Sequence, residues 1–274
     1  MSVVSFPHLE HTGQVTQLRV AVSEWTKLRS VRSTLWTLGV AVLLTIGLPC
    51  LFALVTKSHW NSMGPHEQQD RHPLDVASAG VNLSQLAIAT LAVLTITAEY
   101  STGMIRASFT AVPKRLPVLW AKLGVFGLVT FALMLPSVLI AYWASQAILG
   151  SHNPPILQTS LSSNGVARTV IGGAIYLVLV GVFSMGLGAI VRNTAGGISL
   201  FAAIFFVIPP LLNILPVSWN NAINPWIPDS AARSIFQLTH GTHSLSPAGG
   251  AAVFVGYCAF VVTIAAILMR RRDT

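Results

Sequence analysis

The sequence predicts an all-α integral membrane protein with six transmembrane helices. Hydrophobic residues make up 53% of the 274 residues and charged residues only 9%, whereas a soluble domain has about 25% charged residues. The apolar residues gather in runs of about 20, the length that a helix needs to cross about 30 Å of hydrocarbon. The runs do not alternate as barrel strands do. A backbone in lipid must satisfy its own hydrogen bonds, so each run is predicted to be a helix.

Six apolar runs are long enough to cross a bilayer. The fourth and fifth runs are separated only by "RNTAGG" (192–197), where we expect a tight hairpin with Arg192 at the membrane surface. The third run is followed by the turn-rich "SHNPPILQTSLSSNG" (151–165), which is typical of a loop. The predicted spans are 35–55, 81–98, 118–148, 170–191, 195–215 and 249–269.

The distribution of Lys and Arg predicts that both termini are cytoplasmic, which requires an even number of spans. With the N-terminus inside, the inner segments hold 12 of the 16 bases and the outer loops hold 4, and such an excess marks cytoplasmic loops. A single transmembrane domain (35–269) then follows a cytoplasmic tail and helix (1–34) and precedes a basic cytoplasmic tail (270–274). The inner bases are Arg19, Lys27, Arg29, Arg32, Arg106, Lys114, Arg115, Lys122, Arg192, Arg270, Arg271 and Arg272, and the outer bases are Lys57, Arg71, Arg168 and Arg233.

Residues 15–33 are predicted to form an amphipathic helix before the first span. One face is apolar and the opposite face is polar, and Arg29 and Arg32 break this pattern where the chain turns into the bilayer. A helix of this kind lies on the inner surface of the membrane. It is either a positively charged anchor only or an elbow that also contacts a cytoplasmic partner. The apolar face carries Leu18, Ala21, Val22, Trp25 and Leu28, and the polar face Arg19, Ser23, Thr26 and Lys27.

The stretch "EYSTGMIRASFTAVPKRLP" (99–117) is a short polar element between two apolar runs. Glu99 and Tyr100 stand at the membrane boundary, and Gly103 permits the chain to turn. "MIRASFTAV" then predicts a short cytoplasmic helix that "PKRLP" stops before the third span. A loop that only fixes topology explains the bases. It does not explain Glu99, because acids contribute little to orientation.

The predicted outer loop 216–248 is long but not very polar. It contains Trp219, Trp226 and Phe236, and Trp at this depth is usually an interface anchor. We therefore expect part of this loop to dip back toward the bilayer or to cap the helix bundle.

Several classes of function are excluded by what the sequence lacks. The two cysteines, Cys50 and Cys258, lie in apolar runs as buried thiols. "HEQQD" (66–70) has Asp where a zinc motif H-E-x-x-H has its second His, and it lies in a Pro-flanked loop. No phosphate-binding loop is present, and no ionisable group lies near the middle of a span. The net charge of +8 is concentrated at span ends, which favours a membrane surface over nucleic acid.

Four stretches together resemble a known family. They are "SEWTKLRSVRSTLW" (23–36), "EYSTGMIRASFTAVPKRLPVLWAK" (99–122), "GLGAIVRNTAGGISL" (186–200) and "NPWIPDSA" (224–231). With the order of the spans, the sequence resembles the permease subunits of ATP-binding-cassette (ABC) exporters of the second class, especially the six-span actinobacterial type. The resemblance covers nearly the whole chain.

The resemblance implies that residues 15–33 form a connecting helix and that 99–115 hold a coupling helix, which docks on a separate ATP-binding subunit. It also implies a re-entrant segment within 216–248. Arg106, Lys114 and Arg115 would meet the partner, and Glu99 would tie the element to the membrane helices. The implied connecting-helix residues are Glu24, Trp25, Lys27, Arg29 and Arg32, and the implied coupling residues are Glu99, Tyr100, Gly103, Arg106, Lys114 and Arg115.

Assembly and location follow from the same resemblance. Two permease chains, identical or different, would pair with two ATPase chains in a bacterial cytoplasmic membrane. ATP and Mg would bind to the ATPase chains, so this chain is expected to have no catalytic site, cofactor or metal of its own. Its charge-free interior fits an amphipathic or apolar substrate such as a drug, an antibiotic or a lipid. The alternatives are an ATP-independent carrier, a membrane assembly factor, or a membrane enzyme that uses the outer histidines.

Overall fold

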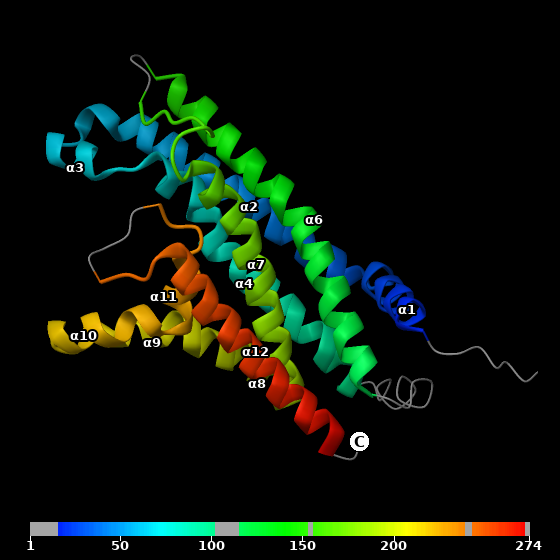
Figure 1. Cartoon of the computed structure of the whole chain (residues 1–274). Coiled ribbons are helices and arrows are strands. Elements are labelled where there is room, and N and C mark those ends of the chain that lie inside the picture. Colours follow the sequence, from blue (N-terminus) through cyan, green and yellow to red (C-terminus); the bar gives the residue numbers. More distant parts are fainter. Residues whose placement is uncertain (1–15, 102–114, 153–155, 239–242, 272–274) are drawn as a thin grey trace, which may run out of the picture.

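The computed structural model describes residues 16–101, 115–152, 156–238 and 243–271. Within these ranges the chain forms helices and no β-strand, and six helices are long and apolar enough to cross a membrane. The predicted all-α fold and the predicted number of candidate spans are thereby confirmed. Figure 1 shows the long helices side by side in an elongated bundle. The spans are α2 (Arg32–His59), α4 (Pro73–Ser101), α6 (Arg115–Gly150), α7 (Val166–Val191), the combined segment α8–α9 (Thr194–Leu212) and α12 (Pro247–Arg271).

The helices are longer than the apolar runs that predicted them. The first predicted span, 35–55, is contained in α2 (Arg32–His59), and the second, 81–98, in α4 (Pro73–Ser101). An apolar run marks only the part of a helix that lipid can surround. The backbone hydrogen-bond ladder continues beyond it into polar turns, since each additional residue adds one bond at little further cost.

The centre of the bundle is α7, which is the most deeply buried of the six spans. It packs against α4, α6, α12 and α8. A small residue also allows close approach of the segment that precedes α12: a Cβ atom added at Gly172 would lie 2.5 Å from the carbonyl oxygen of Ile235. An aromatic group joins α7 to the last two spans, with Phe183 contacting Phe205 and Phe254 at ring-centroid distances of 5.8 Å each.

The fifth span is not one regular α-helix. It consists of α8 (Thr194–Ala202), a π-helical turn over Ala203–Val207 and the short α9 (Ile208–Leu212). The widened turn comes directly before Pro209 and Pro210, which lack the N–H groups that would continue the ladder. This span is also the least buried of the six.

The segment before the last span folds back onto the bundle. It contains α10 (Val217–Ile223), a 3₁₀ turn (Asn224–Trp226) and α11 (Pro228–Arg233). Phe236, just after α11, is buried and packs against Tyr176 of α7 at 4.8 Å between ring centroids. Trp219 and Trp226 remain exposed. The described part of this loop therefore caps the bundle, one of the two arrangements expected.

The segment between α2 and α4 corrects one expectation. "HEQQD" was expected in a loop, but these residues belong to a short helix, α3 (Pro65–Asp70). The helix begins with Pro65 at its first position, where a missing N–H costs nothing. The Gln68 side chain donates a hydrogen bond of 2.7 Å to the carbonyl oxygen of Trp60 and ties α3 to the end of α2.

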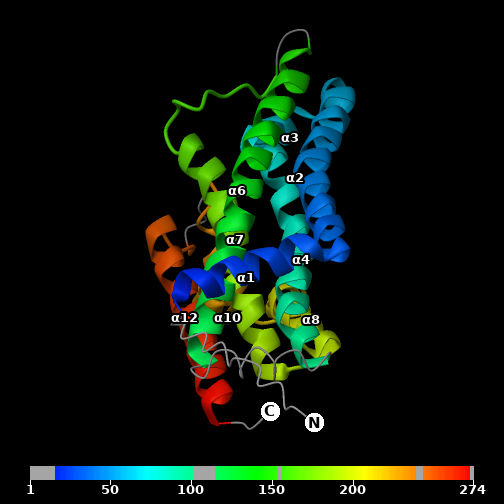
Figure 2. The same ribbon diagram turned by 90° about the vertical axis from the view of Figure 1, so that its right-hand side faces the viewer.

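The first helix, α1 (Gln17–Ser30), is separate from α2 because Val31 between them has an extended backbone. Figure 2 shows α1 lying across the long helices, in front of α6 and α4. Its buried residues, Val20 and Glu24, face the bundle, and Val20 packs against Val118 and Ala121 of α6. Part of the predicted apolar face, including Leu18 and Trp25, is exposed.

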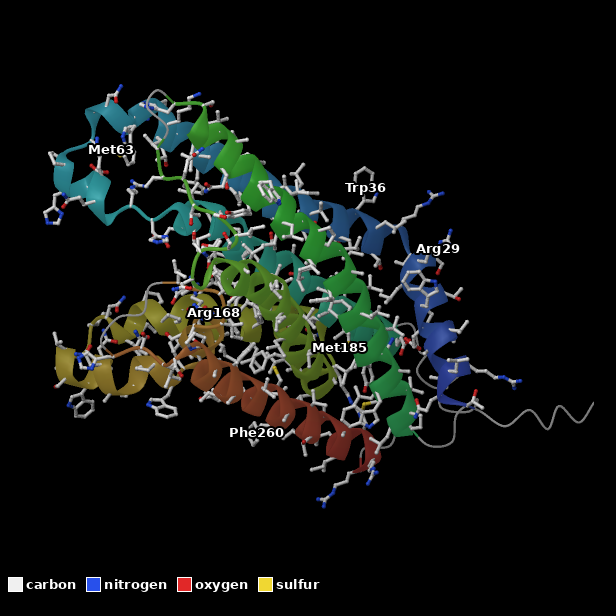
Figure 3. All side chains as sticks on the ribbon, turned by 45° about the horizontal axis from the view of Figure 1, so that its top comes forward. Arg29, Trp36, Met63, Arg168, Met185 and Phe260 are labelled. Carbon is white, nitrogen blue, oxygen red and sulfur yellow. The ribbon has the colours of Figure 1, made fainter. Side chains whose placement is uncertain are left out.

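Large apolar side chains also cover the outside of the bundle. Figure 3 shows Trp36 of α2 and Phe260 of α12 projecting away from it, whereas Met185 lies inside. Trp36 is 77% exposed and Phe260 is 64% exposed. Such a surface is unfavourable in water, because large exposed apolar patches drive association, and it is favourable in lipid. These exposed side chains are therefore compatible with a multi-pass membrane protein.

Candidate functional site

Four charged side chains from three helices meet at the end of the bundle where α1 lies. Glu24 and Lys27 come from α1, Glu99 from the last turn of α4 and Lys122 from the start of α6. The Lys122 Nζ atom lies 2.5 Å from Glu24 Oε2 and 3.1 Å from Glu99 Oε1. The Lys27 Nζ atom lies 2.6 Å from Glu24 Oε1 and 2.8 Å from Glu99 Oε1. Each lysine thus contacts both glutamates, and we call these four residues the four-charge cluster.

The local sequence explains how the cluster forms. Glu24 and Lys27 are three residues apart on one helix, which places them on the same face. Glu99 and Lys122 meet because α4 ends and α6 begins at the same end of the bundle (Figure 1). Lys122 also donates to the carbonyl oxygen of Thr95, one turn before Glu99, at 3.3 Å. The cluster therefore joins the end of α4 and the first turns of α6 to α1.

Burial makes the pairing obligatory. Glu24, Glu99 and Lys122 are 3%, 7% and 5% exposed. An unpaired charge at such a position would face a desolvation cost of several kcal/mol, whereas two positive and two negative charges in contact offset one another. Burial alone opposes the charge on Lys27, but the hydrogen bonds and charges of Glu24 and Glu99 outweigh it and raise the Lys27 pKa. Lys27 is therefore held in its charged form.

A second contact involves Tyr100, the residue after Glu99 at the end of α4. The Arg192 guanidinium lies over the Tyr100 ring, 4.9 Å from its centroid. Its Nε and Nη2 atoms are buried and have no hydrogen-bond partner within the described ranges. Arg192 ends α7 in a left-handed conformation (φ 56°), with its backbone N–H bonded to the Gly188 carbonyl at 2.8 Å. Thr97 and Thr194, which are close in sequence to Tyr100 and Arg192, share a hydrogen bond of 2.7 Å between their hydroxyls, and this bond joins α4 to α8.

The tight hairpin predicted at "RNTAGG" is confirmed. Asn193 caps α8 by accepting a hydrogen bond of 2.9 Å from the Gly196 N–H, as short polar side chains do at helix N-termini. The left-handed residue and the cap together reverse the chain within two residues. This places the end of α7 and the start of α8 against the last turn of α4.

The structure brings some of the predicted site residues together and leaves others apart. Glu24, Lys27 and Glu99 belong to the four-charge cluster, and Tyr100 contacts Arg192 beside it. Trp25, Arg29 and Arg32 are exposed and do not belong to the cluster. Arg115 is the first residue of α6. Gly103, Arg106 and Lys114 lie outside the described residues, as does the predicted coupling helix.

Lys122 is the functional candidate that sequence reasoning missed. It was counted only as one of the inner bases, yet it lies in an apolar stretch, "LPVLWAKLGVFGL" (116–128), as its only charge. A single base in such a run needs a buried counter-charge, because lipid cannot supply one. That signal points to Glu99 as the nearest preceding acid. It does not point to Glu24, which is distant in the sequence.

The four-charge cluster contains two ammonium and two carboxylate groups that pair with one another. Among the described residues, no three His, Cys, Asp or Glu side chains are grouped as metal ligands. What the arrangement can do is hold α1, the end of α4 and the start of α6 in one fixed relation.

Comparison with known proteins adds no assignment. No family model matches this sequence, and no curated protein matches it either. The functional argument therefore depends on the residues and on the geometry of the site.

Proposed function

We propose that this chain is the transmembrane subunit of an ATP-driven ABC exporter and that the four-charge cluster transmits movement from a partner ATPase into the membrane helices. One observation carries the proposal: a buried ion-pair network fastens α1 to both helices that flank the segment 102–114. The resemblance to ABC permeases implies that the partner subunit docks on that segment. In this arrangement the partner subunit binds and hydrolyses ATP.

The network is suited to such a task because its contacts are short and desolvated. A displacement of the segment 102–114 acts directly on Glu99 and Lys122, which stand near its two ends. Glu24 and Lys27 pass the displacement to α1, and α1 continues into α2 through Val31. A solvated ion pair is worth at most about 1 kcal/mol and would yield under load. Buried pairs resist separation, because each charge would be left uncompensated.

The proposed direction of assembly follows from the bases. The excess of Lys and Arg at this end of the bundle supports the proposal that this end faces the cytoplasm, in a bacterial plasma membrane. Two such chains, the same or different, would pair in the membrane and form the substrate path between them. The apolar character of the spans supports an amphipathic substrate such as a drug or an antibiotic.

The experiment that tests this function is a transport assay with a matched pair of variants. The chain is co-expressed with the ATPase encoded beside it, purified and placed in proteoliposomes, and ATP hydrolysis and dye export are measured. Glu99→Gln keeps the shape of the side chain but removes its charge. We expect it to co-purify with the ATPase and to lower export by at least about tenfold, a change of about 1.4 kcal/mol.

Glu67→Gln is the control. Glu67 of α3 lies away from the cluster and forms an exposed ion pair with Arg71, the residue after α3. The control variant should export normally. Undiminished export by Glu99→Gln would contradict the role given to the cluster. Export that needs no ATPase and follows an ion gradient would contradict the exporter assignment as a whole.

A further inference from the structure

A pocket of about 310 Å³ lies directly beside the four-charge cluster, between α1, the start of α2, and the inner halves of α4 and α6. One side is polar, with Ser30 and Ser33 as well as the cluster. The other side is apolar, with Leu91, Leu94 and Phe126. The volume is at the lower end of the range of about 300–1,000 Å³ that small-molecule sites occupy. The pocket is thus large enough for an amphipathic ligand.

Two positive charges stand next to the polar side of the pocket in the sequence. The four residues of the cluster balance one another in formal charge, with two lysines and two glutamates. Arg29 and Arg32 precede the lining residues Ser30 and Ser33 by one position each; both arginines are exposed and do not themselves line the pocket. No acid occurs in the sequence between Glu24 and Glu67. The excess charge at this rim therefore favours an anionic group.

The apolar side of the pocket opens toward the surface that lipid would cover. Ala98 lines the pocket and is exposed, and Leu94 is half-buried. Leu18 and Trp25 of α1 are also exposed, as expected of a helix that rests on a membrane surface. An acyl chain can follow Leu94 and Phe126 inward while a headgroup remains at the level of Ser30.

We propose that this pocket binds an anionic phospholipid of the leaflet on the side of the chain termini, with the phosphate at the Ser30–Ser33 rim and the acyl chain against Leu91, Leu94 and Phe126. In this proposal the Ser30 and Ser33 hydroxyls donate to the phosphate, and the long side chains of Arg29 and Arg32 reach it from beside the pocket with charge-assisted hydrogen bonds. The apolar wall removes the first methylene groups of the chain from water. Basic residues next to a membrane helix favour anionic over zwitterionic headgroups for the same electrostatic reason. This site is independent of whether an ATPase drives the protein.

The test is photo-crosslinking of the full chain in nanodiscs of phosphatidylcholine. The probe is a trace of phosphatidylglycerol with a diazirine near the top of one acyl chain, and labelled peptides are identified by mass spectrometry. We expect labelling to concentrate in 91–98 of α4. Unlabelled phosphatidylglycerol should compete with the probe at least about tenfold better than additional phosphatidylcholine does. This ratio is the effect expected of one charge-assisted hydrogen bond. Glycerol phosphate, which has no acyl chain, should not compete.

Two pairs of variants locate the site. Ala98→Trp fills the pocket and should lower labelling of α4 about tenfold or more, whereas Ala259→Trp, at an exposed position on α12, should leave it unchanged. Arg29→Gln with Arg32→Gln should remove the preference for phosphatidylglycerol. Arg270→Gln with Arg271→Gln, an equal loss of exposed charge on α12, should not.

Three results would overturn the proposal. They are labelling spread evenly over the exposed faces of the spans, equal competition by the two lipids in the unaltered protein, and equal effects of the two arginine pairs. The first two need no variant, so a folding defect in Ala98→Trp leaves the proposal testable.

Discussion

Lys122 of α6 and Glu24 of α1 form an ion pair in which Nζ lies 2.5 Å from Oε2, although the two residues are 98 positions apart in the chain. Both side chains are almost fully buried. The pair fixes the first helix of the protein onto the start of the third span. The free energy of this contact depends on the whole cluster, because Glu99 and Lys27 neutralise the same two charges. The first two predictions below concern this network, and the other two concern the packing and the hairpin next to it.

Lys122→Met should destabilise the protein strongly. The substitution leaves two buried carboxylates facing a single lysine, and breaking a buried pair in this way costs about 3–5 kcal/mol. The thermal unfolding midpoint in detergent should fall clearly, measured by intrinsic fluorescence. Lys57→Met is the control, since Lys57 donates to the Ser151 hydroxyl in an exposed place, and it should change the midpoint little. Equal midpoints for the two variants would mean that the cluster does not hold the helices together.

Stability should decrease at high pH because of Lys27. Glu24 and Glu99 raise the Lys27 pKa above its ordinary value of 10.5 despite burial. A base whose pKa is higher in the folded state stabilises that state fully below the ordinary pKa, and the contribution is lost as the pH rises through the folded pKa. The unfolding midpoint should therefore fall above about pH 10.5, and the fall should be shallower in Lys27→Met. Superimposable pH profiles for the two proteins would contradict the assignment.

Gly172→Ala should destabilise the protein, whereas Gly47→Ala should not. A Cβ atom at residue 172 would meet the Ile235 backbone at 2.5 Å, and one at residue 47 has no atom within 4 Å. Forcing a backbone apart costs about 1–3 kcal/mol, while Ala in place of an open helical Gly gains about 0.5–1 kcal/mol. The two unfolding midpoints should move in opposite directions. A midpoint for Gly172→Ala at or above that of the unaltered protein would show that α7 and the segment after α11 are not so closely packed.

Arg192→Gly should be more stable than Arg192→Ala. Both variants lose the contact with the Tyr100 ring, but only Gly avoids the strain of a positive φ, which costs about 1–2 kcal/mol for other residues. At Ala259, an exposed position inside α12, the order should be reversed: Ala259→Gly should be less stable than the unaltered protein, because Gly weakens a helix interior. Comparison of four unfolding midpoints measures both differences. The same order at both positions would mean that the α7–α8 hairpin does not use a left-handed residue.

The sequence predicted the number of candidate spans correctly, but it did not predict where each helix ends. Runs such as 170–191 correspond to α7 with four extra residues at its start, because hydropathy detects the part that lipid surrounds. The hairpin at 192–197 was predictable because a charged residue and a helix cap occur together there. The short helix α3 was not, since a polar hexapeptide has no apolar face to reveal its period.

The candidate site was predictable only in part. Glu99 drew attention because an acid at a span end has no role in topology, and Glu24 and Lys27 lie in a stretch that resembles a connecting helix. Nothing in the sequence linked Lys122 to Glu24. Their contact depends on the way α1 lies across α6, and that packing is set by Val20, Val118 and Ala121, three small or medium apolar residues with no distinctive pattern.

The sequence by itself determined that this protein is helical, that six segments are suited to lipid, and which end of each segment carries positive charge. These properties follow from composition and period, which act over a few turns of chain. Only the tertiary structure decided that two glutamates and two lysines from three helices form one buried cluster, and that a pocket lies beside it. Ion pairing falls off within a few ångströms, so a partner is known only once the packing of distant helices has placed it there.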